Sequence, residues 1–432
     1  MTSGIPALTS PIVTEAQLRE FVLPVMPDLA AAGLHSSGSK REPTELDSEQ
    51  LLDAFLAATF SALCEPGDRL GGVLTEQLGH EGLLRLVIER ADTQALVGAL
   101  GESAVQAIED QFGAQIGKLW SDSNERWLPR LNQSTVFKAL TTLRGIHGTL
   151  VVRGSKLYPH ALEQLGSGAP HALWARGNSA LLANHRTVAL VGSRSTNHYG
   201  IEATAQIVAT AAAAEIAVVS GGAFGIDAAA HSATLRQGGQ TIAVMAGGVD
   251  RLYPRSNQSL LEQVVAQGLV VSEVPPGVVP AKWRFLMRNR VIAALGLGTV
   301  VVQAGKTSGS LNTARHSLDL SRPVAVVPGP WDSAHSVGCH RFLNEFPGLV
   351  TLLSRPADLT AFLGLGIDED PSLPGLGTLE IRALDTFSSA PMQVWEIQQL
   401  SGLTNTEVQI ALGSLELSGQ ISRVGAAFRR IT

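Results

Sequence analysis

The sequence predicts an α/β protein built on a parallel β-sheet, with a helical region before the sheet and a winged-helix domain after it. Three observations support this fold class. The first ~150 residues place apolar residues at helical spacing, and short β-branched runs alternate with helix-like segments from Thr187 onward. The last ~55 residues have the pattern of three helices followed by a hairpin.

The N-terminal region, residues 1–150, is expected to be a helical packing or interaction domain. The segments AQLREFVLPVMPDLAAAGL and SEQLLDAFLAATFSALC carry apolar residues along one helical face, and a polar loop separates them. We find no cofactor or metal motif in this region.

The middle of the chain, residues 151–367, is expected to form the parallel sheet. Six apolar runs each end in small residues: TVALVGS, IAVVSGG, TIAVMAGG, LVVSEVPPG, TVVVQAG and PVAVVPG. Helix-like segments separate most of them, which is typical of a parallel sheet covered on both faces. Ligands of such sheets bind beyond the carboxyl ends of the strands, where the glycine-rich turns of this sequence fall.

The end of the chain is predicted to be a linker, residues 368–377, and a winged helix, residues 378–432. Helix-like LEIRALDTF, VWEIQQLSG and TEVQIALGSLELSG precede ISRVGAAFRRI, which has the pattern of a β-hairpin. The third helix-like segment contains no cation, and only its Gln409 suits a base edge. A protein-interaction or dimer-supporting role is therefore favoured over sequence-specific transcriptional control.

The composition is typical of a reduced, cytoplasmic globular protein. Of the 432 residues, 45% are hydrophobic and 16% are charged, so we expect a sizeable core and little disorder. Cys64 and Cys339 cannot make a disulfide framework. We expect no secretory signal and no membrane insertion. The net charge of −6 gives no general reason to expect nucleic-acid binding.

The first candidate site is the turn VGSRSTNHYG. Gly192, Ser193 and Arg194 follow a strand and precede a helix, so backbone N–H groups and the Ser193 hydroxyl would face a ligand. Arg194 adds a charged donor fork, and the combination suits a phosphate. An ordinary βα turn with a solvent-exposed arginine explains the same three residues equally well.

The second candidate site is the loop in VVSGGAFGIDAAAH. Its small residues, which would let a ligand approach the backbone, are Ser220, Gly221, Gly222 and Gly225. The pattern is neither the dinucleotide fingerprint nor the Walker motif. Asp227 and His231 on the next helix could pair, orient the loop or act as acid and base. Structural pairing is favoured, since nothing nearby supplies a nucleophile or a metal set.

The third candidate site is KWRFLMRNR, which places cations beside aromatic rings. The cations are Lys282, Arg284, Arg288 and Arg290, and the aromatic residues are Trp283 and Phe285. This mixture is typical of a single-strand-binding surface, although an amphipathic helix with solvated arginines is the alternative. The segment 186–322 carries twelve Lys and Arg against seven Asp and Glu, a net charge of +5 that favours a local anion-binding surface.

From Tyr158 to Leu349 the sequence resembles the DprA/Smf family of DNA-processing proteins. The resemblance rests on blocks in the family's order: VGSRSTNHYG, VVSGGAFGIDAAAH, GGVDRLYPRSN, VVSEVPPG, FLMRNRVIAAL, SGSLNTARHSLDLSRPVAVVPGP and SVGCHRFL. The C-terminal LELSGQISRVGAAFRRI is also similar, whereas the N-terminal region matches only loosely, through EPGDRLGG. The resemblance implies an extended Rossmann-like domain that binds and protects single-stranded DNA. It also implies help in loading the RecA recombinase during natural transformation and recombination, usually as a homodimer.

Carried over by motif, the resemblance implies a DNA pocket without a catalytic residue, a metal or a cofactor. The implied DNA-binding residues are Gly192, Ser193, Arg194, Ser220, Gly221, Gly222, Ala223, Gly225, Lys282, Phe285, Arg288, Asn289 and Arg290. Arg194 and Lys282 would neutralise phosphates, and the glycine N–H groups would bond phosphate oxygens. Phe285 would pack near a base, and Asn289 would read a base edge or orient the loop.

The sequence departs from the family pattern at two positions. Leu286 stands where the family usually has a proline, and Gln303 stands where a glutamate is common. Neither position is an expected phosphate contact, so the implied pocket is retained.

A nucleotide-binding enzyme is the alternative function, because related folds include nucleoside-monophosphate phosphoribohydrolases. Those enzymes carry a PGGxGTxxE signature with a catalytic glutamate, and the nearest segment here, AGKTSGSLNTARH, lacks it. Asp227 and Glu273 remain conceivable acid–base groups, with loop ordering the favoured role. We therefore expect a DNA-binding protein and no enzyme.

Overall fold

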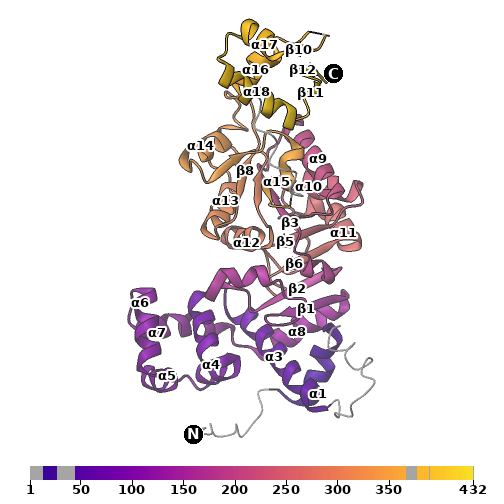
Figure 1. The fold of residues 1–432 in the computed structure, drawn as a ribbon. Helices are drawn as coiled ribbons and strands as arrows, with labels where there is room; N and C mark the ends of the chain where they lie inside the picture. The colour runs from indigo at the N-terminus through magenta and orange to yellow at the C-terminus, as the bar shows by residue number, and fades with distance from the viewer. Residues whose placement is uncertain (1–12, 27–43, 366–376, 389, 432) are drawn as a thin grey trace. The chain divides into compact units, whose positions relative to one another are not determined.

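The computed structural model describes residues 13–26, 44–365, 377–388 and 390–431. The chain forms two compact units, Met1–Gly364 and Leu365–Thr432. The first unit contains the large sheet together with the N-terminal helices, and the second contains helices α16 to α18 with a small sheet (Figure 1).

A nine-stranded sheet forms the centre of the first unit, in the order β1-β2-β6-β5-β4-β3-β7-β8-β9. Its strands are β1 (Gly148–Val152), β2 (Ala172–Gly177), β3 (Thr187–Val191), β4 (Ala217–Ser220), β5 (Thr241–Met245), β6 (Leu269–Ser272), β7 (Thr299–Val301), β8 (Val324–Val326) and β9 (Val350–Leu352). Strands β3 to β9 pair in parallel. Strands β1 and β2 add an antiparallel edge next to β6.

Helices cover both faces of the sheet, as the apolar runs predicted. They are α9 (His198–Ala213), α10 (Ile226–Arg236), α11 (Gln258–Gln267), α12 (Lys282–Leu295), α13 (Ser310–Asp319), α14 (Val337–Glu345) and α15 (Leu359–Phe362), with short turns η4 (His160–Gly168), η5 (Ser179–Ala183), η6 (Arg255–Asn257) and η7 (Pro356–Asp358). In Figure 1, α12 and α13 lie on one side of the sheet and α10 and α11 on the other.

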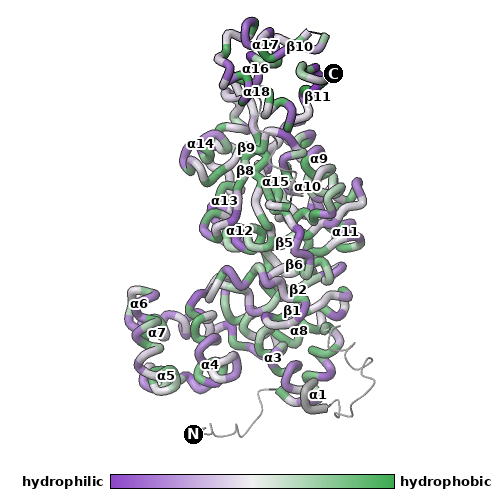
Figure 2. The backbone as a smooth tube through the Cα atoms, in the orientation of Figure 1, coloured by the Kyte–Doolittle hydropathy of each residue, from purple (hydrophilic) through white to green (hydrophobic). Residues whose placement is uncertain are grey.

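The side chains of β5 show why the sheet needs cover on both faces. Ile242 and Val244 belong to the hydrophobic core that includes residues of α12 and α13, whereas Ala243 and Met245 belong to the core that includes residues of α11. Side chains alternate across a strand, so a continuous apolar run must be buried on both faces. In Figure 2 the strands at the centre of this unit are accordingly hydrophobic.

The strand order of the sheet reverses beside β3. In chain order, β3 to β6 add strands on one side, and β7 to β9 then add strands on the other side of β3. The connections after β3 and β7 consequently separate at the carboxyl ends of two neighbouring strands. Open α/β sheets bind ligands in the crevice at such a switch point, so the topology alone indicates where a ligand site should lie.

The N-terminal region is helical, as the sequence predicted. Its elements are α1 (Glu15–Gln17), η1 (Leu18–Val22), η2 (Leu23–Val25), α3 (Thr44–Leu63), α4 (Arg69–Ile88), α5 (Thr93–Leu100), α6 (Glu102–Phe112), α7 (Ile116–Trp127), η3 (Leu128–Arg130) and α8 (Gln133–Gly145). Helix α3 joins two cores, because Phe55 packs with residues of α8 and β1, and Phe60 packs with residues of α4 and α7. Residues 27–34 of the first predicted helical segment lie outside the described residues.

The second unit contains the three helices and the hairpin that the sequence predicted for its end, together with a strand, β10, that it did not predict. It contains α16 (Thr378–Leu384), β10 (Met392–Gln393), α17 (Val394–Ser401), α18 (Asn405–Leu417), β11 (Ile421–Val424) and β12 (Ala427–Arg430). Strands β11 and β12 form an antiparallel hairpin, to which β10 adds a third strand. Ile397, Leu412 and Phe428 lie in its hydrophobic core. The predicted linker, apart from Gly377, lies outside the described residues.

The sequence also predicted no membrane insertion and no disulfide framework. Across the described ranges, no helix is both long enough and apolar enough to cross a membrane. Cys64 and Cys339 are buried, free cysteines.

Candidate nucleic-acid interface

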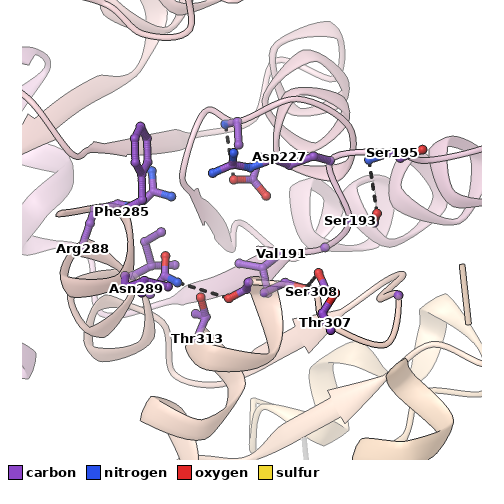
Figure 3. Close-up of a pocket in the computed structure, with 18 residues that line it drawn as sticks. Val191, Ser193, Ser195, Asp227, Phe285, Arg288, Asn289, Thr307, Ser308 and Thr313 are labelled. Carbon is purple, nitrogen blue, oxygen red and sulfur yellow. Dashed lines mark hydrogen bonds between the residues drawn. The ribbon is translucent and has the colours of Figure 1, made fainter. Parts of the chain in front are cut away.

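A pocket of about 470 Å³ opens at the switch point between β3 and β7 (Figure 3). The residues that line it are Val191, Gly192, Ser193, Arg194, Ser195, Ala223, Asp227, Phe285, Leu286, Arg288, Asn289, Ile292, Gly305, Thr307, Ser308, Gly309, Ser310 and Thr313. They come from the turn after β3, the start of α10, one face of α12 and the loop that leads from β7 into α13. The volume is within the usual range for small-ligand sites.

The turn after β3 is fixed by backbone contacts on both sides. The Ser193 N–H donates to the Gln303 carbonyl at 2.7 Å, and the Ser193 carbonyl accepts from the Ile226 N–H at 3.2 Å. Gly225 has φ of +75°, and a Cβ there would lie 2.2 Å from the Ser193 carbonyl oxygen, so this close approach requires glycine. The turn therefore fixes the backbone that carries Arg194 beside the pocket.

The Phe285 ring on α12 lies close to two guanidinium groups, those of Arg194 in the turn after β3 and of Arg288 on α12. The Phe285 ring centre lies 5.5 Å from the Arg194 guanidinium carbon and 5.7 Å from that of Arg288. The Tyr253 ring, which is about half exposed, lies 5.7 Å from the Phe285 ring. Cation–π contacts of this kind hold aromatic and cationic groups together at a binding surface. Arg194 is exposed, so its charge remains available to an anion.

Arg288 forms the floor of the pocket. It is buried, and its Nη1 donates to the carbonyls of Gly221 at 2.6 Å and Val244 at 2.9 Å. A Cβ at Gly221 would lie 2.5 Å from the guanidinium, so the glycine makes room for this side chain. Burial lowers the pKa of Arg288 to about 10, which leaves it charged at neutral pH.

Asp227 is a buried carboxylate in the same wall. Burial raises its pKa, and the nearby Arg288 charge and the backbone N–H groups of Ala223 and Gly221 oppose that rise. The Ala223 N–H donates to Asp227 Oδ2 at 3.4 Å (Figure 3). These glycine-loop donors therefore face Asp227, whereas the sequence interpretation directed them at a phosphate.

The pairing favoured between Asp227 and His231 is absent from the hydrogen bonds and ion pairs of the described residues. His231 is fully buried, and its Nδ1 instead lies 2.8 Å from Thr241 Oγ1. The four-residue spacing placed both groups on α10, but the fold turns the imidazole toward β5 and the carboxylate toward the loop. Asp227 thus orders the loop, which was one of the alternatives.

The remaining arginines of the α12 cluster face away from the pocket. Arg290 is buried, pairs with both carboxylate oxygens of Glu273 and donates to the Gly168 carbonyl. Arg284 donates to both carboxylate oxygens of Glu65, at 2.8 and 3.1 Å. Arg290 is thereby paired with a carboxylate that directly follows β6, and Arg284 shares the Glu65 carboxylate with Arg130.

The pocket brings together seven of the thirteen implied DNA-binding residues. They are Gly192, Ser193, Arg194, Ala223, Phe285, Arg288 and Asn289. The other six do not line it: Ser220, Gly221, Gly222, Gly225, Lys282 and Arg290. Ser220 is buried and donates its hydroxyl to the Leu190 carbonyl, whereas Lys282 is exposed at the start of α12.

The loop from β7 into α13 is a wall that the sequence interpretation missed. Thr307, Ser308 and Ser310 bring hydroxyl groups to the pocket, and the Asn289 amide donates to the Gly309 carbonyl at 3.3 Å. This loop belongs to AGKTSGSLNTARH, which the sequence interpretation used for the family resemblance and for the absence of a catalytic glutamate, without assigning it a DNA contact. Its position after the strand beside β3 was the signal that could have identified it.

The two departures from the family pattern have clear local roles. Gln303 Nε2 donates to Asn197 Oδ1 at 2.9 Å, and its Oε1 accepts from the Thr196 hydroxyl at 2.7 Å. A glutamate could not donate to Asn197, so the amide suits this turn. Leu286 is half exposed and lines the pocket mouth.

The fold and the site define a Rossmann-like α/β protein with a cationic, partly aromatic crevice at its switch point. Residues 149–363 match the family described as DNA recombination-mediator protein A. The DNA processing protein DprA of Mycobacterium tuberculosis is 43% identical over 256 residues, which cover 59% of this chain and 63% of that protein. DprA of Streptococcus pneumoniae is 40% identical over 194 residues, 45% of this chain and 68% of that protein.

A solved structure supports the same assignment. The X-ray structure of DNA processing protein A from Streptococcus pneumoniae matches with a TM-score of 0.54 at 28% identity, and the match covers 72% of this chain and 97% of that one. The chain therefore belongs to the DprA/Smf family of DNA-processing proteins. The aligned part spans just under two thirds of the Mycobacterium tuberculosis relative, at 63% of its length.

Proposed function

We propose that the chain binds single-stranded DNA in the switch-point pocket and acts as a recombination mediator. The observation that carries this proposal is the Arg194 guanidinium held over the Phe285 ring at the pocket mouth. A cation and a ring at one opening can take a phosphate and the base attached to it. Family membership supports the same ligand class, because the family is named for DNA processing and recombination.

The geometry favours a single strand over a duplex. A base reaches a ring or a pocket only when it is unstacked and unpaired, and a pocket of about 470 Å³ has room for a nucleotide but not for a helix. The proposed contacts to phosphates and base faces are also present in every sequence. We therefore expect strong preference for single strands and little dependence on base sequence.

Fluorescence anisotropy tests this proposal. A labelled single-stranded oligonucleotide is titrated with the chain at several salt concentrations, with duplex and scrambled-sequence competitors. The proposal predicts tight, salt-dependent binding that single strands of any sequence displace and duplex displaces poorly. A strong preference for one duplex sequence would contradict it.

The biological setting is proposed from the resemblance. We propose that the chain protects incoming strands in the cytoplasm, helps load RecA during natural transformation and recombination, and works as a homodimer. Residues 151–367 would bind the DNA, and residues 378–432 would form a winged helix that supports protein contacts. Light scattering at micromolar concentration tests the dimer, and a monomer would argue against it. A RecA filament-nucleation assay on coated single strands tests the loading role.

We propose that the chain has no enzymatic activity. Asp227 accepts backbone N–H groups of its own loop, and Glu273 is paired with Arg290, so both carboxylates have structural partners. The alternative, a nucleoside-monophosphate phosphoribohydrolase, would release free base from a nucleotide. Chromatography after incubation with the common nucleoside monophosphates distinguishes the two, and base release that depends on Asp227 would overturn the non-enzymatic proposal.

A further inference from the structure

The loop after β8 exposes an aromatic side chain beyond the pocket. Trp331 is 88% exposed, more than any other large hydrophobic side chain among the described residues. Tryptophan is usually mostly buried because its ring carries a large apolar area. An exposed indole on the same edge of the sheet as the candidate site is therefore a candidate for stacking against a ligand.

The exposure of Trp331 does not come from a loosely held loop. The Tyr199 hydroxyl donates to the Pro328 carbonyl, and the Ser333 N–H donates to the Pro330 carbonyl at 3.1 Å. The Ser336 N–H then donates to the Ser333 carbonyl at 3.0 Å. Contacts on both sides of Trp331 thus fix the backbone that presents the ring.

The same loop is bonded to the pocket wall. His335 Nδ1–H donates to the carbonyl of Ser195, a pocket residue, at 3.1 Å. The Ala304 N–H donates to the His335 carbonyl at 2.9 Å, next to the pocket residue Gly305. Trp331 lies four residues before His335, so their Cα atoms are at most about 14 Å apart. That reach equals about four nucleotides at the B-form rise of one strand.

Lys306 adds an exposed cation beside the pocket, on a loop whose backbone approaches the start of α14. Lys306 is exposed between the pocket residues Gly305 and Thr307, and no ion pair among the described residues includes it. The Gly305 carbonyl lies against the backbone of Gly338, at the start of α14, so Lys306 borders the segment that carries Trp331. An anionic backbone that crossed from the pocket to Trp331 would pass a positive charge on the way.

We propose that a single strand bound in the pocket continues past Lys306 and stacks one of its bases on Trp331. This inference rests on the proposed function and extends its binding site to single strands longer than the pocket can hold. Stacking on an exposed indole is tolerant of sequence because every base has a face. The Lys306 ammonium would contact the backbone between the two sites.

The experiment compares a dinucleotide, which is short enough to end in the pocket, with an oligonucleotide of about 12 nucleotides, a length within the span of known single-strand sites. Loss of stacking in Trp331→Ala is expected to weaken binding of the longer oligonucleotide about 5-fold to 100-fold, and to leave the shorter one unchanged. Trp331→Phe keeps a ring and should retain most of the affinity, whereas Trp331→Leu keeps apolar area alone and should behave like alanine. Lys306→Ala should lower the salt slope for the longer oligonucleotide by about one unit.

The outcomes separate this inference from the proposed function. Tight binding of both lengths by wild type and by Trp331→Ala would overturn the stacking site while leaving the pocket in place. Equal loss for both lengths in Trp331→Ala would also overturn it, since a base contact outside the pocket cannot affect a strand that ends inside it. Failure of folded wild type to bind either length would overturn the proposed function and this inference together.

Discussion

The two sides of α12 use the same kinds of residue for opposite purposes. On the pocket side, the exposed Arg194 guanidinium lies over the Phe285 ring, and no carboxylate among the described residues forms an ion pair with that arginine. On the opposite side, Arg290 is buried against Glu273, and Arg284 is held by Glu65 of the N-terminal region. One side leaves charge available to a ligand, and the other uses charge to join the helix to its neighbours.

The difference shows that a cluster of cations in a sequence is not one functional unit. Successive residues of a helix with 3.6 residues per turn are about 100° apart, so Arg288 and Arg290, two residues apart in KWRFLMRNR, point in nearly opposite directions. What decides the role of each arginine is the carboxylate that the fold brings to it, and Glu65 lies far away in the sequence. The predictions below test this division, beginning with the largest effect.

Removal of the buried arginine should cost the most stability. Arg290→Ala leaves the Glu273 carboxylate buried without its partner, so the free energy of unfolding should fall by about 3–5 kcal/mol. Urea denaturation, followed by circular dichroism, measures the loss. The double variant Arg290→Met/Glu273→Gln removes both charges and should recover much of it. Unchanged stability in Arg290→Ala would show that the pair is not structural.

Removal of the ring on the pocket side should cost binding and little stability. Phe285→Ala is expected to weaken single-strand binding by about 1–3 kcal/mol, the usual value of one base–aromatic stack. Trp283→Ala is the matched control, because Trp283 lies two residues away, contacts Arg284 and does not line the pocket. Equal losses in the two variants, measured by anisotropy, would contradict the division of the helix.

The buried histidine behind the pocket should make stability depend on pH. Burial, aided by the charge of Arg288, lowers the pKa of His231 to about 3, whereas the unfolded chain has its ordinary value near 6.5. The unfolded state therefore binds the extra proton, and the stabilisation is complete above pH ~6.5 and lost as the pH falls toward 3. The slope from this group approaches about 1.4 kcal/mol per pH unit.

Thermal unfolding between pH 7 and pH 5 measures this slope. In His231→Asn the free energy of unfolding should depend less steeply on pH, because the proton that His231 takes up on unfolding no longer contributes. This holds even if the variant is less stable at pH 7. A slope identical to that of wild type would show that His231 does not titrate with unfolding.

The exposed lysine at the start of α12 should have the smallest effect. Lys282 is exposed and does not line the pocket, so it can meet only the phosphate backbone outside it. Lys282→Ala should reduce the salt slope of binding by about one unit and leave preference among sequences unchanged. A salt slope equal to that of wild type would remove Lys282 from the interface.

The sequence predicted the central sheet well because a continuous apolar run indicates a strand that is buried on both faces. The six predicted runs correspond to β3 through β8. The antiparallel strands β1 and β2 precede the alternation of strands and helices that starts at Thr187, and β9 has three residues of which only one is buried, so these three strands were not predicted. The turn of Arg194 and the pocket face of α12 could be predicted from local patterns. The pairing of Arg290 with Glu273 and the β7 loop could not, because both depend on which strands become neighbours.

The most direct test compares one arginine from each side. Single-strand anisotropy titrations are run with wild type, Arg194→Ala and Arg284→Ala at several salt concentrations, after folding is checked by circular dichroism. The account predicts that Arg194→Ala weakens binding and lowers the salt slope by about one unit, while Arg284→Ala binds like wild type. Equal loss in both variants, or loss only in Arg284→Ala, would contradict the claim that the switch-point pocket binds the DNA.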